Sequence, residues 1–166
     1  IARKKIRSID YLLERRPFCF FNIYTSRNIK FDSKKEKIFS GMVSGCCFMI
    51  KNNIFRDING FDENIFLYSE EDVMAYKLDS LNYKVGICDE ALVLHKHSES
   101  ISKQGLAFRR KFSLLSPLYC LKVYEKKSFG LIYFCYLNAV IQYALFSLFD
   151  KSYRSNFSDF MGRFLK

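Results

Sequence analysis

The stretch Phe129–Phe149 is 21 residues long and carries no charged side chain, and it constrains the fold more than any other feature of the sequence. A helix of about 20 apolar residues is long enough to cross the hydrocarbon core of a bilayer. Lysines flank both ends of the stretch. The sequence therefore allows three alternatives: a membrane span, a helix lying in the membrane interface, or a helix packed on the domain.

The chain has 166 residues, the size of one ordinary domain that can bury its own core. Hydrophobic residues make up 49% and charged residues 27%, which excludes a disordered polyelectrolyte. Residue 1 is Ile rather than Met, so we expect the chain to begin inside a longer one. The charged opening residues lack the apolar core of a signal peptide. The six cysteines include no Cys-x-x-Cys pair, which argues against a cysteine zinc site and favours a reducing compartment.

The net charge of +10 is unevenly distributed along the chain. Residues 1–40 carry eleven Lys or Arg against four Asp or Glu, residues 41–100 carry five against ten, and residues 101–166 carry eleven against three. The basic flanks are either an ordinary solvated surface or a surface that attracts anionic lipid or another anionic ligand. Ten central carboxylates and the lack of an aromatic RNA-binding motif argue against a nucleic-acid binder.

The hydrophobic pattern alternates strands with helices, which is typical of an α/β fold. The strand candidates are residues 41–50, 84–88 and 91–94, of which 41–50 is small, apolar and expected to be buried. The helix candidates are residues 3–15, 51–58, 70–81 and 104–125, with a break or kink expected at Pro117. Residues 26–38 are predicted to form a polar loop, and Asn59-Gly60 a turn.

Three consecutive carboxylates, Glu70, Glu71 and Asp72, open the helix predicted over residues 70–81. Ser69 precedes them as a candidate N-cap. Adjacent carboxylates repel, so at least one of them should have a raised pKa if they are partly buried. Such a group is well placed to act as a general base. The alternative is that the three acids only stabilise the positive end of the helix dipole.

His95 and His97 are the only histidines, and they lie two residues apart at the end of an apolar strand candidate. In extended backbone their side chains point the same way. One of them is a candidate ligand of a divalent metal or of phosphate. The alternative is a histidine that only ends the strand.

Residues 41–100 contain an ordered series of short motifs. They are SGCCFMIK (44–51), Ile54-Phe55, NGFDENIFLYSEED (59–72), LNY (81–83), KVGICDEALVLH (84–95) and HSES (97–100). In order and spacing the series resembles the second half of the catalytic domain of family 2 glycosyltransferases with the GT-A fold, a Rossmann-like α/β fold. The likeness is greatest to bacterial enzymes of surface-polysaccharide assembly.

The resemblance implies an inverting sugar transfer from a nucleotide-diphosphate sugar to a lipid-linked or saccharide acceptor. The acceptor hydroxyl attacks the anomeric carbon while a carboxylate takes its proton. A divalent metal, Mg²⁺ or Mn²⁺, stabilises the diphosphate leaving group in such enzymes. The reaction is expected at the cytoplasmic face of the cell membrane, where the protein would be peripheral or cross once through residues 129–149.

The resemblance also assigns residues to roles. Counting back thirteen residues from Tyr83 puts the family's Glu on Glu70 and its base on Glu71, whereas reading the Glu-Asp pair literally puts the base on Asp72. We favour Glu71. The implied substrate-binding residues are Gly45, Cys46 and Tyr68, and the implied metal or diphosphate contact is His95.

One departure from the family pattern is large. The family's nucleotide-binding half precedes this region and carries a metal-binding Asp-x-Asp, and the sequence contains no Asp-x-Asp. We therefore expect residues 1–100 to be the acceptor-side part of the catalytic domain, with the donor-binding half and most of the metal site missing. Residues 101–166 are expected to form a basic, apolar helical tail. The 166 residues alone are predicted not to turn over a sugar nucleotide.

One alternative function is a non-catalytic, membrane-peripheral module or gene remnant. It predicts salt-sensitive binding to anionic vesicles and no effect of sugar nucleotides on stability. A basic nucleic-acid binder would instead show a steep dependence of affinity on salt.

Overall fold

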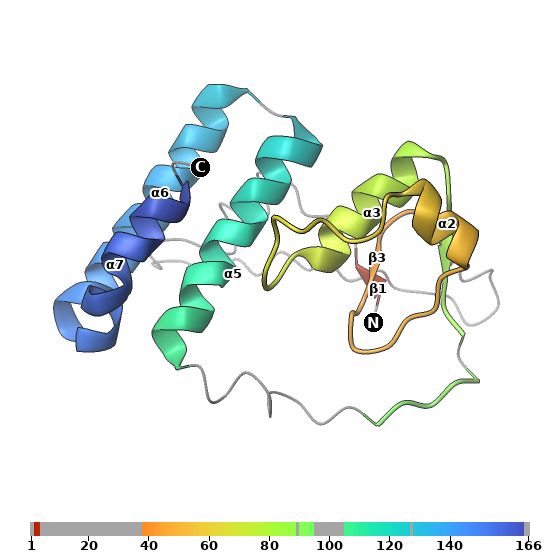
Figure 1. Cartoon of the computed structure of the whole chain (residues 1–166), viewed down its shortest axis with the longest axis horizontal. Coiled ribbons are helices and arrows are strands. Elements are labelled where there is room, and N and C mark those ends of the chain that lie inside the picture. The colour runs from red at the N-terminus through yellow and green to blue at the C-terminus, as the bar shows by residue number, and fades with distance from the viewer. Residues whose placement is uncertain (1, 4–37, 89, 95–104, 127, 165–166) are drawn as a thin grey trace.

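A computed structural model describes residues 2–3, 38–88, 90–94, 105–126 and 128–164 (Figure 1). The described elements form a helical part, built from α5 to α7, and a smaller part around α2 and α3. Most of the helix predicted over residues 3–15, the loop over 26–38, His95 and His97 lie outside the described residues.

Two small antiparallel sheets account for the strands of the described residues. β1 (Ala2–Arg3) pairs with β3 (Met42–Val43), and β2 (Ile38–Phe39) pairs with β4 (Val85–Gly86). The buried strand expected over 41–50 is thus wrong beyond residue 43, because the residues that follow have no ladder partner among those described. Met49 is 98% exposed.

The other two strand predictions are also corrected. The strand expected over 84–88 is reduced to the two residues of β4, and residues 91–94 form no strand and are exposed. At residue 3 the chain is extended rather than helical. The described part of the chain is therefore mostly helical. That residues 1–100 form half of a GT-A fold stays a prediction.

The predictions for the short helix, the turn and the acidic helix are confirmed. α2 (Asn52–Asp57) ends in a turn where Asn59 and Gly60 both have positive φ, 54° and 58°. α3 (Glu70–Ser80) follows, and two residues after its end Asn82 takes the left-handed conformation at φ 59°.

α3 joins the two parts because it contributes to both hydrophobic clusters. Val73 is 2% exposed and belongs to the cluster of the helical part, with residues from α5, α6 and α7. Met74 and Leu78 pack instead with Ile58, which follows α2. The first turn of α3, which carries the three acids, thus lies between two packed cores.

α5 (Leu106–Cys120) continues directly into a π-helical turn, η1 (Leu121–Glu125). Pro117 is buried inside α5. Of the break or kink expected there, the break is wrong, because three more helical residues follow before the backbone widens into η1. A proline removes one helical N–H and crowds the preceding turn, and a π-helical turn is one way in which a helix adjusts its register.

α6 (Phe129–Phe149) has the bounds of the uncharged stretch, and α7 (Lys151–Phe164) folds back along it. Asp150 lies between them and accepts a hydrogen bond of 2.8 Å from the Ser152 N–H. The rings of Tyr143 and Phe160 stack at 4.3 Å, and both side chains are fully buried. α5 packs beside this hairpin, so α6 is covered along one side (Figure 1).

The packing of the α6–α7 hairpin predicts that replacing Phe160 destabilises the protein far more than replacing Phe149. Phe160→Ala should lower the free energy of unfolding by about 3–5 kcal/mol, because it leaves a cavity beside Tyr143. Phe149→Ala is the matched control and should change it little, because Phe149 is 88% exposed. Urea unfolding followed by circular dichroism measures both, and equal effects would contradict the packing of the hairpin.

Candidate active site at the start of helix α3

Asp62 is the most heavily bonded residue of the loop that leads to α3, residues 61–69, called here the 61–69 loop. Its Oδ2 accepts hydrogen bonds from the hydroxyls of Tyr119 (2.9 Å) and Tyr124 (2.8 Å). Its Oδ1 accepts from the backbone N–H (3.0 Å) and the side-chain amide (2.8 Å) of Asn64. One carboxylate therefore ties the loop to α5 and η1.

This bonding changes the acidity of all three groups. Partial burial raises the pKa of Asp62, but the hydrogen bonds from Asn64 and the tyrosines outweigh it and hold the pKa below its usual value. Burial and the hydrogen bond to Asp62 raise the pKa of Tyr119 and, more strongly, that of Tyr124. Asp62 is thus a stable anion held by two neutral phenols.

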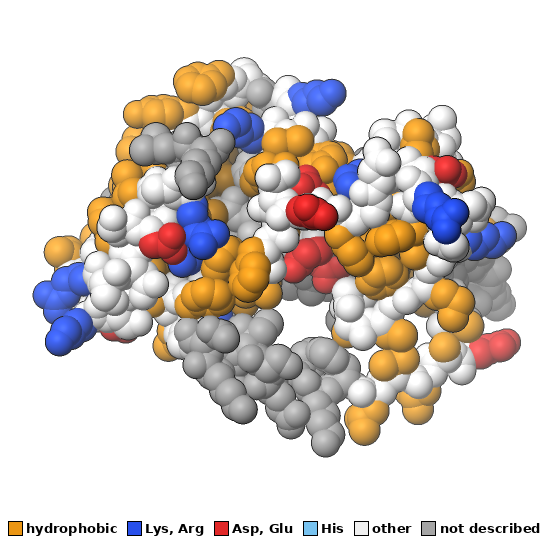
Figure 2. All heavy atoms as spheres, viewed as in Figure 1, with side chains coloured by type: hydrophobic (Ala, Val, Ile, Leu, Met, Phe, Trp, Pro, Cys, Tyr) orange, Lys and Arg blue, Asp and Glu red, His pale blue; other side chains and the backbone are white. Residues whose placement is uncertain are grey.

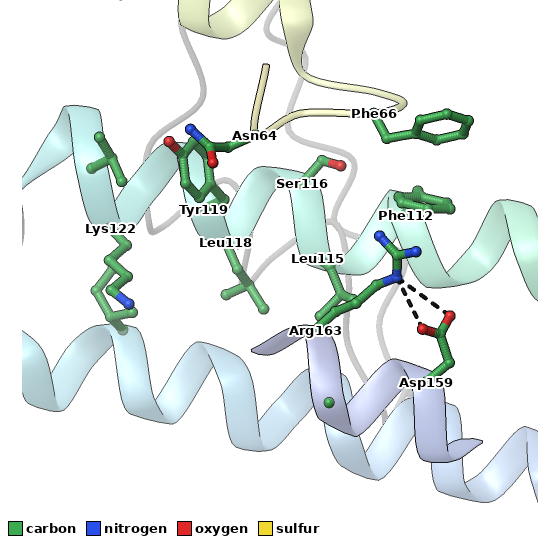
Figure 3. Close-up of a pocket in the computed structure, with 13 residues that line it drawn as sticks. Asn64, Phe66, Phe112, Leu115, Ser116, Leu118, Tyr119, Lys122, Asp159 and Arg163 are labelled. Carbon is green, nitrogen blue, oxygen red and sulfur yellow. Dashed lines mark hydrogen bonds and ion pairs between the residues drawn. The ribbon is translucent and has the colours of Figure 1, made fainter. Parts of the chain in front are cut away.

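α5 holds the same loop at a second place. The buried Ser116 hydroxyl donates a 2.6 Å hydrogen bond to the Leu67 carbonyl. The ring of Phe66 lies 5.1 Å from that of Phe112 and 6.1 Å from that of Phe108. Figure 3 shows Ser116 and Phe112 directed from α5 toward the loop.

The loop enters α3 through two strained residues. Tyr68 and Ser69 both have positive φ, 66° and 67°, a conformation that costs energy in residues other than glycine. The predicted N-cap position of Ser69 is confirmed, but its backbone is left-handed and its side chain makes no capping hydrogen bond. The contacts to α5 hold the backbone in this conformation and aim the first turn of α3.

The three acids have different environments. Asp72 is only 3% exposed. Glu70 is half-buried and lines a cavity of about 240 Å³ together with Asp62 and three hydrophobic side chains, those of Phe61, Ile65 and Val73. Figure 2 shows acidic side chains near the middle of this face, between the helical part and the α2–α3 part.

The pKa of Glu70 is raised. Burial is the main cause, and the negative charges of Glu71 and Asp72 add to it. This is the direction that repulsion between adjacent carboxylates predicts. Glu70 therefore holds its proton to a higher pH than an exposed glutamate.

Glu71 meets the small-residue segment that follows β3. The Gly45 N–H donates a 2.9 Å hydrogen bond to Glu71 Oε1, across 26 residues of sequence. A Cβ atom at position 45 would overlap that oxygen, so any residue other than glycine would push the Glu71 carboxylate out of its present place. Two of the predicted site residues are thus in direct contact.

Of the remaining predicted site residues, the structure gives a position for Cys46 and Tyr68 and none for His95. Cys46 is exposed next to Gly45, and Tyr68 is half-buried in the 61–69 loop. His95 lies outside the described residues.

A metal site is not formed by the residues that the structure describes. No three His, Cys, Asp or Glu side chains among them are close enough to hold an ion. Both oxygens of Asp62 already accept hydrogen bonds from N–H and O–H donors, and Asp72 is buried. The divalent metal that the resemblance implies rests instead on His95, which lies outside the described residues, and on an Asp-x-Asp half that the sequence does not contain, so it stays a prediction.

A larger cavity, of about 700 Å³, lies beside the site between the 61–69 loop, α5 and α7 (Figure 3). Phe66, Phe112 and Leu115 give it apolar walls, and Lys122 and Arg163 bring positive charge. Arg163 is held at 3.1 Å by Asp159, which also pairs with the buried Lys111. A cavity with apolar walls and a few polar groups is the usual form of a small-molecule site.

One curated protein is similar to part of the chain. Over 78 residues the chain is 33% identical to the O-antigen chain rhamnosyltransferase RfbN of Salmonella typhimurium strain LT2. The match covers 45% of this chain and 24% of that protein, so the chain spans about a quarter of its length. No protein-family model and no solved structure matches the chain. The likeness supports a glycosyltransferase at this general level.

Sequence reasoning missed the residues that hold the site. Asp62 was part of a motif but had no assigned role, and Ser116, Tyr119 and Tyr124 were not considered. The tyrosines lie 57 and 62 residues from Asp62, so no local pattern reveals the contact. The signal that was present is a lone Asp between Phe and Glu in the motif that follows Asn59-Gly60.

The Gly45–Glu71 contact predicts a coupled pair of substitutions. Gly45→Ala should displace the Glu71 carboxylate and lower the free energy of unfolding by about 1 kcal/mol, the worth of one hydrogen bond. In a Glu71→Ala background the same change should cost little. A double-mutant cycle by urea unfolding measures the coupling. Gly162→Ala, where a Cβ meets nothing, is the control and should stabilise α7; additive effects at 45 and 71 would contradict the contact.

Glu70 predicts an unusual dependence of stability on pH. Because its pKa is raised in the folded state, its contribution to stability is fully present below the unfolded value of 4.5 and is lost as pH rises through the folded pKa. Glu70→Gln should therefore make the protein more stable than the wild type at pH 7.5, and this gain should disappear at pH 4. Urea unfolding at the two pH values measures it, with Glu63→Gln, at an exposed position, as control. A variant less stable than the wild type at pH 7.5 would overturn this account.

Proposed function

We propose that the chain is the acceptor-side part of an inverting glycosyltransferase related to family 2, with the GT-A fold. The observation that carries the proposal is the contact between Glu71, in the first turn of α3, and the backbone of Gly45. These two positions are the ones that the family resemblance assigns to the base and to the neighbourhood of the donor sugar. The general likeness to a rhamnosyltransferase supports the same reaction class.

Glu71 is the best placed of the three acids to take a proton from an acceptor. It is partly exposed, and one of its oxygens is held by the Gly45 N–H. Asp72 is too buried to reach a substrate hydroxyl without a rearrangement of α3. Glu70 faces the small cavity, and its raised pKa keeps it protonated to a higher pH than an exposed glutamate, which suits it less to accept a proton.

The proposed reaction is a direct displacement. Glu71 accepts the proton of an acceptor hydroxyl as the oxygen attacks the anomeric carbon, and the nucleoside diphosphate leaves from the opposite face. The new bond forms on the face away from the leaving group, so the anomeric configuration inverts. Among the described residues no three His, Cys, Asp or Glu side chains are close enough to hold a metal ion. The Mg²⁺ or Mn²⁺ that the resemblance implies would be held by His95 and by the Asp-x-Asp half.

The donor class follows from the relative's name. A rhamnosyl group on a nucleotide diphosphate is the first donor to test, and a saccharide of the O-antigen kind, free or lipid-linked, is the first acceptor. Residues 101–166 carry eleven basic and three acidic side chains, and α6 is long and apolar enough to cross a membrane. Both features support the proposal that the protein works at the cytoplasmic face of the membrane.

A second function is favoured by one observation. The 166 residues contain no Asp-x-Asp, so a membrane-peripheral module without catalytic activity fits the sequence as well. Thermal unfolding with and without nucleotide-diphosphate rhamnose separates the two functions in the complete product of the gene. A shift of the melting temperature supports the transferase, and its absence supports the binding module.

The assignment of the base predicts the effect of Glu71→Gln on transfer by the complete gene product. Loss of a general base should lower kcat about 10²- to 10⁴-fold and leave the KM for the donor almost unchanged. Transfer of radiolabelled sugar to the acceptor measures both constants. Glu63→Gln, at an exposed position of the 61–69 loop, is the matched control and should keep full activity.

Asp72→Asn decides between the two candidate bases. It should reduce activity only as far as it reduces stability, because Asp72 is buried. If Asp72→Asn abolished transfer in a folded protein and Glu71→Gln did not, the base would be Asp72. If both variants kept their activity, the acid motif would have no role in proton transfer.

A further inference from the structure

One long face of α6 is exposed and entirely hydrophobic. The residues that the structure leaves exposed on this helix are Phe129, Gly130, Tyr133, Phe134, Leu137, Leu145, Phe146, Leu148 and Phe149. At 100° per residue they fall mostly within one half of the helix circumference. They form two groups, at 129–137 and 145–149, and the half-buried Val140, Ile141 and Ala144 join them on the same side of a helix about 31 Å long. Patches of this extent on a protein surface mark an interaction site.

The opposite face of α6 is buried and carries the helix's two amides. Gln142 is 2% exposed and accepts a 3.0 Å hydrogen bond from the Arg110 guanidinium of α5. Its own amide lies 3.4 Å from Asn138 Oδ1. The two faces therefore differ in kind: one is fixed to α5 and α7 by specific polar contacts, and the other presents only hydrophobic side chains.

The surroundings of the exposed face are basic. Lys126 precedes α6, and Lys151 and Arg154 follow it, all of them exposed. Of the nearby acids, Asp150 caps α7, Asp159 pairs with Lys111 and Arg163, and the half-buried Glu125 directly precedes Lys126. Figure 2 shows hydrophobic side chains along the outer edge on the α6 side and basic ones at lower left, where Figure 1 places the turn into α7.

The packing of α6 against α5 and α7 argues against a membrane span. The helix has the length and hydropathy of a span. However, its partners carry charge at seven positions: Arg109, Arg110, Lys111, Lys151, Arg154, Asp159 and Arg163. A charged side chain at the bilayer centre costs roughly 3 kcal/mol or more. Crossing would require α6 to leave α5 and α7, which would expose Asn138 and Gln142 to lipid.

We propose that α6 lies flat in the interface of an anionic membrane, with its exposed face among the acyl chains and α5 and α7 on the aqueous side. An apolar helical face with cations at both ends is the form of a helix that binds in the plane of the membrane. A second copy of this chain is a weaker occupant, because its equally basic rim would repel the first. The inference deepens the membrane location proposed above and does not depend on sugar transfer.

Tryptophan reporters test the proposal directly, because the sequence contains no tryptophan. Three single variants of the full chain, Phe129→Trp, Leu137→Trp and Leu148→Trp, place one fluorophore at the start, middle and end of the face. Phe61→Trp is the matched control, since Phe61 is an exposed aromatic residue outside the helical part. Each is mixed with phosphatidylglycerol vesicles and with phosphatidylcholine vesicles, without donor or acceptor. Lipids brominated near the headgroup or near the chain ends report the depth.

A flat helix gives one pattern of results. All three α6 reporters should shift to the blue on phosphatidylglycerol vesicles and be quenched equally by the shallow bromine label, while the Phe61→Trp control does not shift. A spanning helix would instead place position 137 deepest and the two ends shallow. A blue shift that needs no vesicles and grows with protein concentration would assign the face to a second copy. Either of these results, or no shift on vesicles, overturns the proposal.

The exposed cations beside α6 predict that binding to vesicles depends on the charge of the lipid. The Lys151→Gln and Arg154→Gln double variant should bind phosphatidylglycerol vesicles roughly tenfold more weakly, because each cation near the surface adds to binding. Raising the salt concentration should weaken wild-type binding in the same direction. Lys84→Gln, an exposed cation near β4, is the control and should bind as the wild type does. Equal binding to neutral and anionic vesicles would contradict the role of the basic rim.

Discussion

The four hydrogen bonds to the Asp62 carboxylate are the interaction on which the rest of the site depends. Two of them, from Tyr119 and Tyr124, join the 61–69 loop to α5 and η1 across 57 and 62 residues of sequence. The hydrogen bonds to Asp62 and the one from Ser116 to Leu67 hold Tyr68 and Ser69 in the left-handed conformation at the entry to α3. The direction of that entry decides that Glu71 reaches Gly45 and that Glu70 faces the small cavity.

Asp62 and Glu70 line the same cavity and affect stability in opposite ways. Asp62 has a lowered pKa, so its contribution is present at neutral pH and is lost as pH falls through the folded value. Glu70 has a raised pKa, so its ionisation opposes folding at neutral pH. A structure that stabilises one carboxylate and tolerates another, less favourable one beside it is typical of a site selected for function rather than for stability.

The sequence predicted the local elements well and the tertiary contacts poorly. α2, the turn at Asn59-Gly60, α3 and the bounds of α6 follow from periodicity, turn residues and the uncharged run. Strands were overestimated, because a strand needs a partner that a local pattern does not reveal. Proximity of Gly45 and Glu71 was implied only by the family resemblance, and Ser116, Tyr119 and Tyr124 were invisible because their partners are far away in sequence.

The stereochemistry of transfer by the complete gene product decides whether the proposed inverting reaction is right. Proton NMR of the anomeric signals follows a nucleotide-diphosphate sugar and an acceptor from the first minutes of the reaction. A single base at Glu71 and a direct displacement predict a product with the anomeric configuration opposite to that of the donor. Retention of configuration, or no transfer to any saccharide acceptor, would contradict the assignment of this site to an inverting sugar transfer.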